Sequence, residues 1–350
     1  MTASSSPSPY WVSTDDWHTA GEPFRIVSDL PSDCTTTGST VRERRQNIVN
    51  VPDHPLDALR RALCQEPRGH ADMYGGFIVP PDDDQAAFGV LFWHKDGFST
   101  ACGHGTIALG YWAIATGRVK LPDGGSGSVD VVIDVPSGRV TAQMTVQQGA
   151  IIHADFLNVP SYQLANQITL NIPSVARDIT LDLSWGGAVY AFADAGLFGL
   201  QVEEKNHDHF VALGREIKAT LGERARHDDL ELYGVCFYTN LSDDDEAFTS
   251  RNVVVFADGQ IDRSPCGSGT AARVALLYAQ NRLGEGSSKV LKHHSIINTA
   301  FRASIHRSYI ESRSEFPACI PQVRGTANLM GQNRFYIDQS DPTFPGFVFR

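Results

Sequence analysis

Apolar and polar residues alternate along much of this chain, which is the pattern of half-buried antiparallel strands. The alternation predicts strands at residues 77–80, 88–93, 129–135, 140–146, 188–193, 253–256 and 333–337. Two longer stretches, residues 106–116 and 270–281, are apolar almost throughout, as buried helices are. Residues 207–221 carry a single apolar stripe, which predicts an amphipathic helix. Many strands with few helices predict an α+β chain.

One short motif occurs twice. Cys102 begins Cys-Gly-His-Gly-Thr before the first apolar stretch, and Cys266 begins Cys-Gly-Ser-Gly-Thr before the second, 164 residues later. Self-similarity at almost half the chain length predicts two related domains and not a tandem array. We expect an N-terminal domain at residues 10–178, a C-terminal domain at residues 179–339 and a disordered tail at residues 1–9. Residues 340–350 could return to the N-terminal domain.

The repeated motif places a thiol at the start of a helix. Glycines let a ligand approach the backbone closely, and the first N–H groups of a helix lack helical partners and can bind a carboxylate. The same helix ends predict lowered pKa values for both thiols. A single copy is as compatible with packing as with chemistry. Two matched copies predict two thiols facing one ligand, the geometry for removing a proton from one face of a carbon and returning one to the other.

Composition narrows the classes of partner. The chain has 350 residues, which suits two domains, and a net charge of −11 without a basic block, which argues against nucleic acid and anionic membrane surfaces. No apolar run approaches the length of a spanning helix, and the N-terminus does not resemble a secretory signal. Six cysteines without a CxxC pair predict neither a disulfide framework nor a zinc site. We therefore expect free thiols in the cytoplasm and a small-molecule substrate.

Four longer segments resemble the proline racemase family. They are DWHTAGEPFRIV at residues 16–27, EPRGHADMYG at residues 66–75, GVLFWHKDGFSTACGHGT at residues 89–106 and DRSPCGSGT at residues 262–270. The resemblance extends from about residue 11 to the C-terminus. The family comprises proline racemases, 4-hydroxyproline 2-epimerases and trans-3-hydroxy-L-proline dehydratases.

The resemblance implies a fold like that of diaminopimelate epimerase. Two pseudo-symmetric domains would each wrap strands around a central helix, with the active site in the cleft between them. It also implies a homodimer that uses no pyridoxal phosphate, no metal and no other cofactor.

The resemblance implies that Cys102 and Cys266 are the catalytic pair. The substrate-binding residues expected around them are Gly103, His104, Asp262, Gly267, Ser268 and Cys236. The glycines and the serine would donate to the substrate carboxylate, and the Cys236 thiol would line the ring pocket. Three of these residues also have a structural interpretation. His104 could be a hydrogen bonder at the helix start, Asp262 a turn cap, and Cys236 a small apolar residue on a buried strand.

Other polar and cysteine residues receive structural interpretations. His18, Glu22, Arg68, His70 and Asp72 are interpreted as buried networks that fix turns. His70 and Asp72 lack a third ligand at a plausible spacing, so no metal site is predicted. Three further cysteines have no motif around them and are expected to have no role in the reaction: Cys34, Cys64 and Cys319.

Residue 266 decides between two reactions. In the family, racemases and epimerases have cysteine at both turns, whereas dehydratases typically have threonine at the second. Cys266 therefore favours inversion at Cα of proline or hydroxyproline. Residues 185–192 and 341–347 resemble the dehydratase branch, which keeps trans-3-hydroxy-L-proline dehydration as the alternative. A non-catalytic amino-acid binder is a distant third, because a binder has no need for both thiols.

Overall fold

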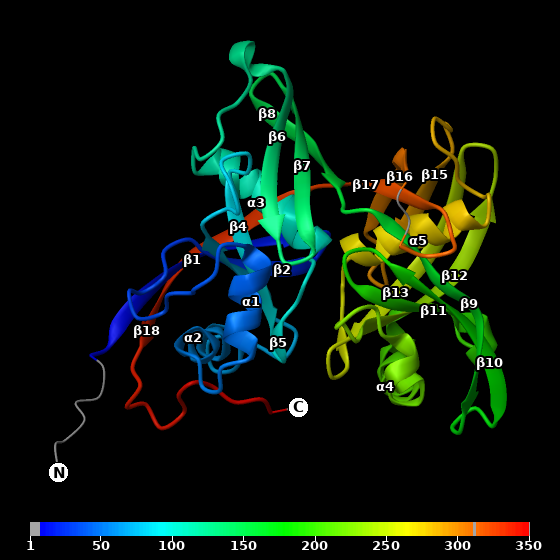
Figure 1. Cartoon of the computed structure of the whole chain (residues 1–350), viewed down its shortest axis with the longest axis horizontal. Coiled ribbons are helices and arrows are strands. Elements are labelled where there is room, and N and C mark those ends of the chain that lie inside the picture. The colour runs from blue at the N-terminus through cyan, green and yellow to red at the C-terminus, as the bar shows by residue number, and fades with distance from the viewer. Residues whose placement is uncertain (1–7, 311–312, 350) are drawn as a thin grey trace.

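The computed structural model describes residues 8–310 and 313–349, so residues 1–7 of the expected tail lie outside it. The described chain forms two lobes side by side, each with strands wrapped around one helix (Figure 1). The central helices are α3 (Gly103–Ala115) and α5 (Gly267–Ala279). The α+β class and the pair of lobes around central helices are as predicted.

The first lobe contains most of the N-terminal half. Its elements besides α3 are β1 (Tyr10–Thr19), β2 (Glu22–Val27), α1 (Val41–Val49), α2 (Pro55–Cys64), β3 (Tyr74–Val79), β4 (Phe88–His94), β5 (Gly97–Phe98), β6 (Gly127–Val135), β7 (Gly138–Gln147), β8 (Ala150–Leu157) and β18 (Ala327–Ile337). The helices α1 and α2 were not predicted. A capping box between Thr40 and Glu43 begins α1, and Pro55 follows the N-cap His54 in α2.

The second lobe contains the remaining elements. Besides α5 these are β9 (Ser161–Ile172), β10 (Arg177–Trp185), β11 (Val189–Asp194), α4 (His207–Leu221), β12 (Leu232–Asp243), β13 (Ala247–Phe256), β14 (Gln260–Ile261), β15 (Val290–His294), β16 (Ala300–Tyr309) and β17 (Ala318–Gly325). Short 3₁₀ helices occur in this lobe at η2 (Ala195–Phe198), η3 (Glu204–Asn206) and η4 (Gly222–Ala225), and in the first lobe at η1 (Asp123–Gly125).

The strand pairing repeats from one lobe to the other. In the first lobe β2 is parallel to β3, β3 antiparallel to β4, and β4 parallel to β6. In the second lobe β11 is parallel to β12, β12 antiparallel to β13, and β13 parallel to β15. Each central helix follows a short hairpin, β4–β5 or β13–β14. The duplication read from the two cysteine motifs therefore extends to the order and direction of the strands.

The pairing also indicates where the lobes divide. β9 pairs with β10 and β17, β17 also pairs with β8 of the first lobe, and β18 returns to pair with β1. The expected boundary after residue 178 would separate two paired strands, each of which satisfies the other's backbone groups. A boundary between β8 and β9 keeps β9 with β10, and the β8–β17 pairing then joins the two lobes. Residues 327–337 pair with β1 and go with the first lobe. The C-terminal segment lies against the same lobe, where Phe347 forms a β-bridge with Glu66.

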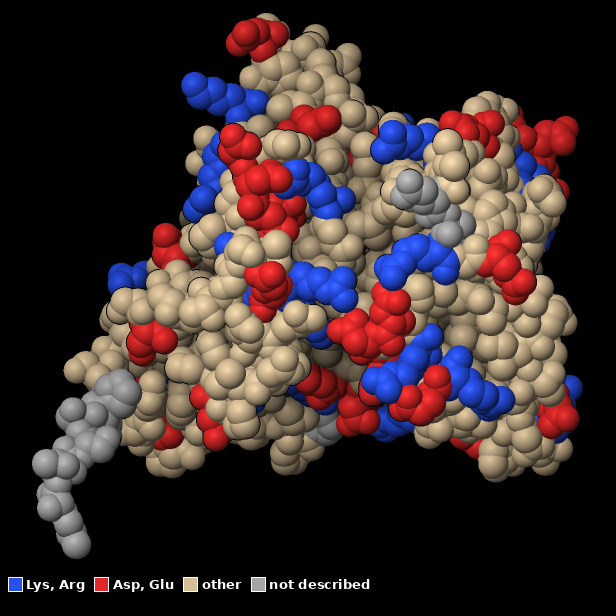
Figure 2. Space-filling model, viewed as in Figure 1, with Lys and Arg blue, Asp and Glu red and all other residues tan. Residues whose placement is uncertain are grey.

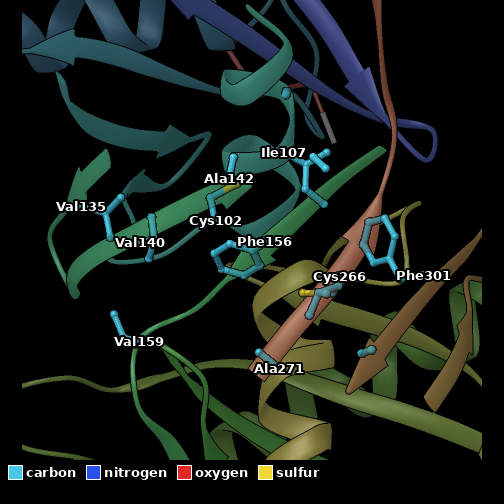
Figure 3. Close-up of a cluster of buried hydrophobic side chains, with 14 of the residues drawn as sticks. Cys102, Ile107, Val135, Val140, Ala142, Phe156, Val159, Cys266, Ala271 and Phe301 are labelled. Atoms are coloured by element: carbon cyan, nitrogen blue, oxygen red, sulfur yellow. The ribbon is translucent and has the colours of Figure 1, made fainter. Parts of the chain in front are cut away.

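Both central helices are buried through most of their length. Residues 103–110 and 267–277 are buried without interruption, which explains why these stretches are apolar on every side. One hydrophobic cluster contains side chains from both helices, together with Cys102 and Cys266 (Figure 3). All six cysteines are buried as free thiols. Within the described ranges, no helix combines the length and the apolar character that crossing a bilayer requires.

Candidate active site between two helix N-termini

The N-termini of α3 and α5 meet face to face. A Cβ atom built on Gly103 would lie 2.6 Å from the Gly267 backbone, and one built on Gly267 would lie 2.6 Å from the Gly103 backbone. Such distances are shorter than side-chain contacts allow, so only glycine at both positions lets the helix ends approach this closely. The first glycine of each motif is therefore required by the junction of the two lobes.

Each cysteine is the N-cap of its helix. The Cys102 Sγ accepts a hydrogen bond from the Gly105 N–H at 3.2 Å, and the Cys266 Sγ accepts one from the Gly269 N–H at 3.3 Å. The second glycine of the motif supplies this donor in both copies. The repeated sequence thus builds the same local structure twice, with a thiol fixed above the first turn of a buried helix.

Both thiols lie on the wall of one small cavity. The cavity is lined by Glu22, Tyr74, Ala101, Cys102, His104, Tyr233, Phe256, Asp262, Cys266 and Ser268. We call it the thiol cavity. Its volume is about 10 Å³, which is about the space that one water occupies. The structure is therefore a closed form, and the lobes must part before a five-membered ring can enter.

Burial raises the pKa of both cavity thiols well above the ordinary cysteine value. The negative charge of Asp262 adds to this effect at Cys102 and at Cys266, while the N–H groups of Gly105 and Gly269 oppose it. The expectation of lowered thiol pKa values is therefore wrong for the closed form. Complete burial outweighs the favourable helix end, because a thiolate without solvent costs more than one N–H bond returns.

Asp262 and Ser264 fix the turn before Cys266. The Asp262 Oδ1 accepts bonds from the Ser264 N–H at 2.8 Å and the Ser264 hydroxyl at 2.7 Å. The Ser264 Oγ accepts a bond from the Cys266 N–H at 3.0 Å. Cys266 itself has φ of 63°, a conformation that non-glycine residues rarely adopt. Asp262 thus caps the turn, as its structural interpretation expects, and it also lies on the wall of the thiol cavity. Its role in substrate binding stays a prediction.

The two thiols have different neighbours. The Cys102 Sγ lies 3.4 Å from the His104 Nδ1, and burial lowers the pKa of His104 to about 4, so the ring is neutral near pH 7. The Cys266 Sγ lies 3.7 Å from the Tyr190 hydroxyl, which is 2.6 Å from the Ser268 Oγ. His104 and Ser268 occupy the same position of the two motifs, but Tyr190 has no counterpart in either motif.

Glu22 lines the thiol cavity, although from the sequence it was expected only to take part in a buried network that fixes a turn. Its Oε2 accepts a bond from the Arg263 N–H at 2.8 Å and pairs with the Arg263 guanidinium at 3.1 Å, so it joins the lobes. Its Oε1 is buried without a hydrogen-bond partner. Burial raises the pKa of Glu22 well above its ordinary value, although Arg263 opposes the rise. Its place in the quoted segment at residues 16–27 was the available signal.

Two tyrosines form another wall that sequence reasoning missed. The Tyr74 and Tyr233 hydroxyls lie 3.2 Å apart, and the Tyr74 hydroxyl also bonds the Ser99 hydroxyl. The Phe256 ring stacks on Tyr233 with centroids 5.6 Å apart. Tyr74 begins β3 and Tyr233 lies near the start of β12, which are equivalent strands of the two lobes. No short motif contains both residues, so only the folded duplication brings them together.

Several expected residues lie elsewhere. Cys236 is fully buried on β12 but does not line the thiol cavity, and burial raises the pKa of its thiol to about 12. In the closed form it fits the interpretation as a small core residue and not as a wall of the ring pocket. Gly103 and Gly267 form the helix junction beside the cavity. The His18 Nδ1 accepts a bond from the Gly21 N–H, so it fixes a turn as expected, but this bond is exposed and not part of a buried network.

A wide groove between the lobes adjoins the thiol cavity. It has a volume of about 1050 Å³ and shares Tyr233 with the cavity wall. Side chains of α1 and α4 line opposite sides of it, among them Arg45 and Lys218. Basic and acidic side chains gather along this seam in Figure 2. We expect a substrate to reach the thiols from this groove, past the Tyr74–Tyr233 contact.

The comparison with known proteins identifies the family. Residues 15–348 match the sequence model of the family described as proline racemase. The chain belongs to this family. The resemblance based on the four sequence segments is thereby confirmed.

Curated relatives of this family member carry more than one activity name. The chain is 36% identical over 346 residues to a trans-3-hydroxy-L-proline dehydratase of Bacillus cereus, covering 96% of this chain and 97% of the relative. It is also 36% identical over 346 residues to a 3-hydroxyproline 2-epimerase of Burkholderia multivorans, covering 97% and 98%. A crystal structure of a probable proline racemase from Agrobacterium radiobacter K84, with bound carbonate, is 25% identical, superposes with a TM-score of 0.86 and covers 96% of each chain. Proteins with these names are isomerases or hydro-lyases, and this chain is an enzyme of one of these classes.

Proposed function

We propose that this enzyme inverts the configuration at Cα of proline or hydroxyproline by proton transfer between two cysteines, without a cofactor. One observation carries the proposal: Cys102 and Cys266 line the same buried cavity from opposing helix N-termini. A two-base inversion needs an acid–base group on each face of one carbon. The duplicated fold provides these groups as a matched pair of thiols.

The same arrangement offers sites for the two charged groups of an amino acid. The substrate carboxylate would accept bonds from the N–H groups of Gly103, His104, Gly267 and Ser268, at the positive ends of the two helices. The Asp262 carboxylate would pair with the ring ammonium. These contacts would place Cα between the sulfurs.

In the proposed step a thiolate removes the α-proton. The Cα–H bond breaks, an S–H bond forms, and the electron pair is delocalised into the substrate carboxylate. The helix-end N–H groups stabilise the charge that builds there. The opposite thiol then donates its proton to the other face of Cα, and its sulfur becomes the thiolate. For the enantiomer the roles of Cys102 and Cys266 exchange, so the resting pair titrates as one coupled unit.

Substrate binding would also help to ionise a thiol. In the closed form the charge of Asp262 contributes to the raised pKa values of both cysteines. A ring ammonium beside Asp262 would neutralise this contribution. The pKa of the thiols would then fall as the substrate binds, and one thiolate would form where the α-proton is to be removed.

The cavity wall favours a hydroxylated ring. Cys236, which was expected to line the ring pocket, does not line the cavity, whereas the Tyr74 and Tyr233 side chains do. A phenolic hydroxyl can donate to or accept from a ring hydroxyl. We therefore expect hydroxyproline to be turned over with a higher kcat/KM than proline.

Dehydration of trans-3-hydroxy-L-proline is the second candidate, and the name of the Bacillus cereus relative favours it. In this reaction one thiolate would remove the α-proton and the electron pair would expel the 3-hydroxyl, which leaves as water after protonation. The product would be a pyrroline carboxylate. Only one thiolate is required, so the presence of Cys266 is the observation that places inversion first.

One assay separates these reactions. The enzyme is incubated in D₂O with L-proline, trans-4-hydroxy-L-proline or trans-3-hydroxy-L-proline, and the products are resolved by chiral chromatography and mass spectrometry. Inversion gives the D-configured epimer with deuterium at Cα. Elimination gives a pyrroline that reacts with o-aminobenzaldehyde. Bound but unchanged amino acid, without deuterium exchange, would contradict both proposals and indicate a binder.

Assembly and location are further proposals. We infer a homodimer in the cytoplasm, as the family resemblance implies, and the six free thiols suit a reducing compartment. Sedimentation velocity of the purified chain and fractionation of cells that express it test these two inferences. A monomer at micromolar concentration, or a secreted chain, would contradict them.

A further inference from the structure

We propose that Tyr190 is a positioning residue for Cys266, with its hydroxyl donating a hydrogen bond to the Cys266 sulfur and receiving one from the Ser268 hydroxyl. Its role in turnover rests on the proposed function, but the contact itself can be measured without any substrate. Tyr190 does not line the thiol cavity, so it acts on the reaction through the thiol.

The geometry of three side chains carries this inference. The Tyr190 hydroxyl is 3.7 Å from the Cys266 Sγ, within the range of a hydrogen bond to a large sulfur atom, and 2.6 Å from the Ser268 Oγ. All three side chains are buried. Burial also raises the pKa of the Tyr190 phenol well above its ordinary value, so the hydroxyl keeps its proton for donation. A thiolate cannot donate, and the hydrogen bond to it must therefore come from Tyr190.

Comparison of the two motifs explains why a tyrosine is needed. In the first motif His104 follows Cys102 by two residues, and its ring reaches the Cys102 sulfur directly at 3.4 Å. In the second motif the equivalent residue is Ser268, whose shorter side chain bonds Tyr190. The Tyr190 hydroxyl thus supplies at Cys266 the polar contact that the imidazole supplies at Cys102. The site is therefore symmetric in its thiols, but their partners differ. Cys102 has the His104 ring beside it and a Tyr74 hydroxyl that lowers its pKa, whereas Cys266 has the Tyr190 hydroxyl.

The contact belongs to one lobe. Tyr190 is on β11, and Cys266 and Ser268 are at the start of α5, so all three lie in the second lobe. Opening of the cleft as a movement of whole lobes would leave this contact intact. The thiol would then have its partner before the substrate arrives.

Other ionisable groups also face Cys266 and set the background for its titration. They are Asp262 from the preceding turn, Cys236 and Tyr233 from β12, and Tyr74, Glu22, Cys102 and His104 from the first lobe. The first-lobe groups move away when the cleft opens. Asp262 and Cys236 stay, and both raise the pKa of the Cys266 thiol. Tyr190 opposes them, because its hydrogen bond favours the thiolate.

The test is Tyr190→Phe, read by alkylation in the absence of substrate. Each thiol is treated with iodoacetamide from pH 6 to pH 10, and the modified peptides are counted by mass spectrometry. We expect the midpoint for Cys266 to rise by about one pH unit, so its alkylation at pH 8 slows about tenfold, the worth of one hydrogen bond to a charged group. Cys102 should change less than twofold. If inversion is the reaction, kcat/KM should fall by the same factor in both directions, because the enzyme cannot alter the equilibrium between epimers.

Tyr278→Phe is the matched control. Tyr278 lies at the far end of α5 from Cys266, and its hydroxyl is 2.9 Å from the Ser308 Oγ. We expect its removal to leave the alkylation midpoints of both thiols unchanged. Ser268→Ala is the second variant, and we expect a smaller rise for Cys266 because Tyr190 loses its donor. If Tyr190→Phe does not fold, the Cys266 midpoint of Ser268→Ala tests the proposal by itself. An unchanged Cys266 midpoint, or equal slowing of both thiols, would overturn the proposal. Wild-type protein without turnover would refute the proposed function and leave the alkylation result standing.

Discussion

Asp262 acts on both halves of the site. Its carboxylate holds the turn before Cys266 through Ser264, and its charge raises the pKa of Cys102 as well as that of Cys266. The first effect could be predicted from sequence, because Asp262 precedes Cys266 by four residues. The second could not, because Cys102 reaches Asp262 only when the two lobes meet.

Replacing Asp262 with Asn separates these two effects. The Asn oxygen can still accept the bonds from Ser264, but the negative charge is lost. Because that charge raises the thiol pKa values, its removal lowers them and increases the thiolate fraction between pH 7 and 9. We expect faster alkylation of Cys102 and Cys266, and a kcat/KM reduced by about 10², since the substrate ammonium loses a buried charged partner. Slower alkylation would show that Asp262 stabilises the thiolates.

Substitution of the thiols distinguishes inversion from elimination. Cys102→Ser and Cys266→Ser should each lower inversion by about 10²–10⁴, because a serine hydroxyl cannot replace a thiol as acid or base near neutral pH. Cys266→Thr should lose inversion but retain or gain dehydration of trans-3-hydroxy-L-proline, whereas Cys102→Ser should lose both. Chiral chromatography and the pyrroline assay measure the two products. Efficient dehydration by the wild type without any inversion would show that Cys266 is not a second base.

At the scale of elements, the junction of α3 with α5 depends on the two facing glycines. Gly267→Ala would place a methyl group 2.6 Å from the Gly103 backbone, so the helix ends must separate. We expect kcat/KM to fall by about 10² through misplacement of the thiols, while each lobe still folds. Gly284→Ala is the control, because a Cβ there meets no atom within 4 Å. Full activity of Gly267→Ala, measured beside this control, would contradict a closed active form with this junction.

The elements that could be predicted are those whose burial leaves a regular pattern. The buried helices and the strands β4, β6 and β7 follow their apolar sequences closely. The helix α1 was missed because its sequence is mostly polar and only Val41, Arg44 and Ile48 are buried. The helix α2 was missed although its sequence carries the Pro55 signal and an apolar stripe at Leu56, Leu59 and Leu63.

The residues of the candidate site also fall into those that could be predicted from the sequence and those that could not. Cysteines, glycines, His104 and Ser268 lie in contiguous motifs, so local reasoning finds them. Tyr190, Tyr74 and Tyr233 come from strands far apart in the chain, and only the duplicated pairing of the sheets brings them to the thiols. The lowered thiol pKa was a wrong expectation, because a helix end is visible in sequence and complete burial is not.

At the scale of the molecule, closure is held by polar contacts between the lobes. Glu22 pairs with Arg263, the Thr299 hydroxyl donates to the Ala20 carbonyl at 2.8 Å, and the Gln260 amide donates to the Ala71 carbonyl at 2.8 Å. The thiol cavity between these contacts is smaller than a proline ring. Turnover therefore requires the lobes to open, admit the substrate from the groove and close again, as lids do in other enzymes.

Binding of a planar analogue tests this cycle. Pyrrole-2-carboxylate has a carboxylate for the helix ends and a flat ring that resembles the deprotonated carbon, so it should hold the closed lobes around itself. We expect a saturating concentration to slow alkylation of Cys102 and Cys266 at least tenfold and to reduce the radius of gyration measured by small-angle X-ray scattering. The four other cysteines, buried within the lobes, should react equally slowly with and without the analogue. Because stoichiometric iodoacetamide should inactivate the free enzyme through Cys102 or Cys266, activity should fall in proportion to the labelling of these thiols, and the analogue should preserve it. Inactivation that follows labelling of Cys34 or Cys319 instead would show that the reaction does not depend on the thiols between the helices.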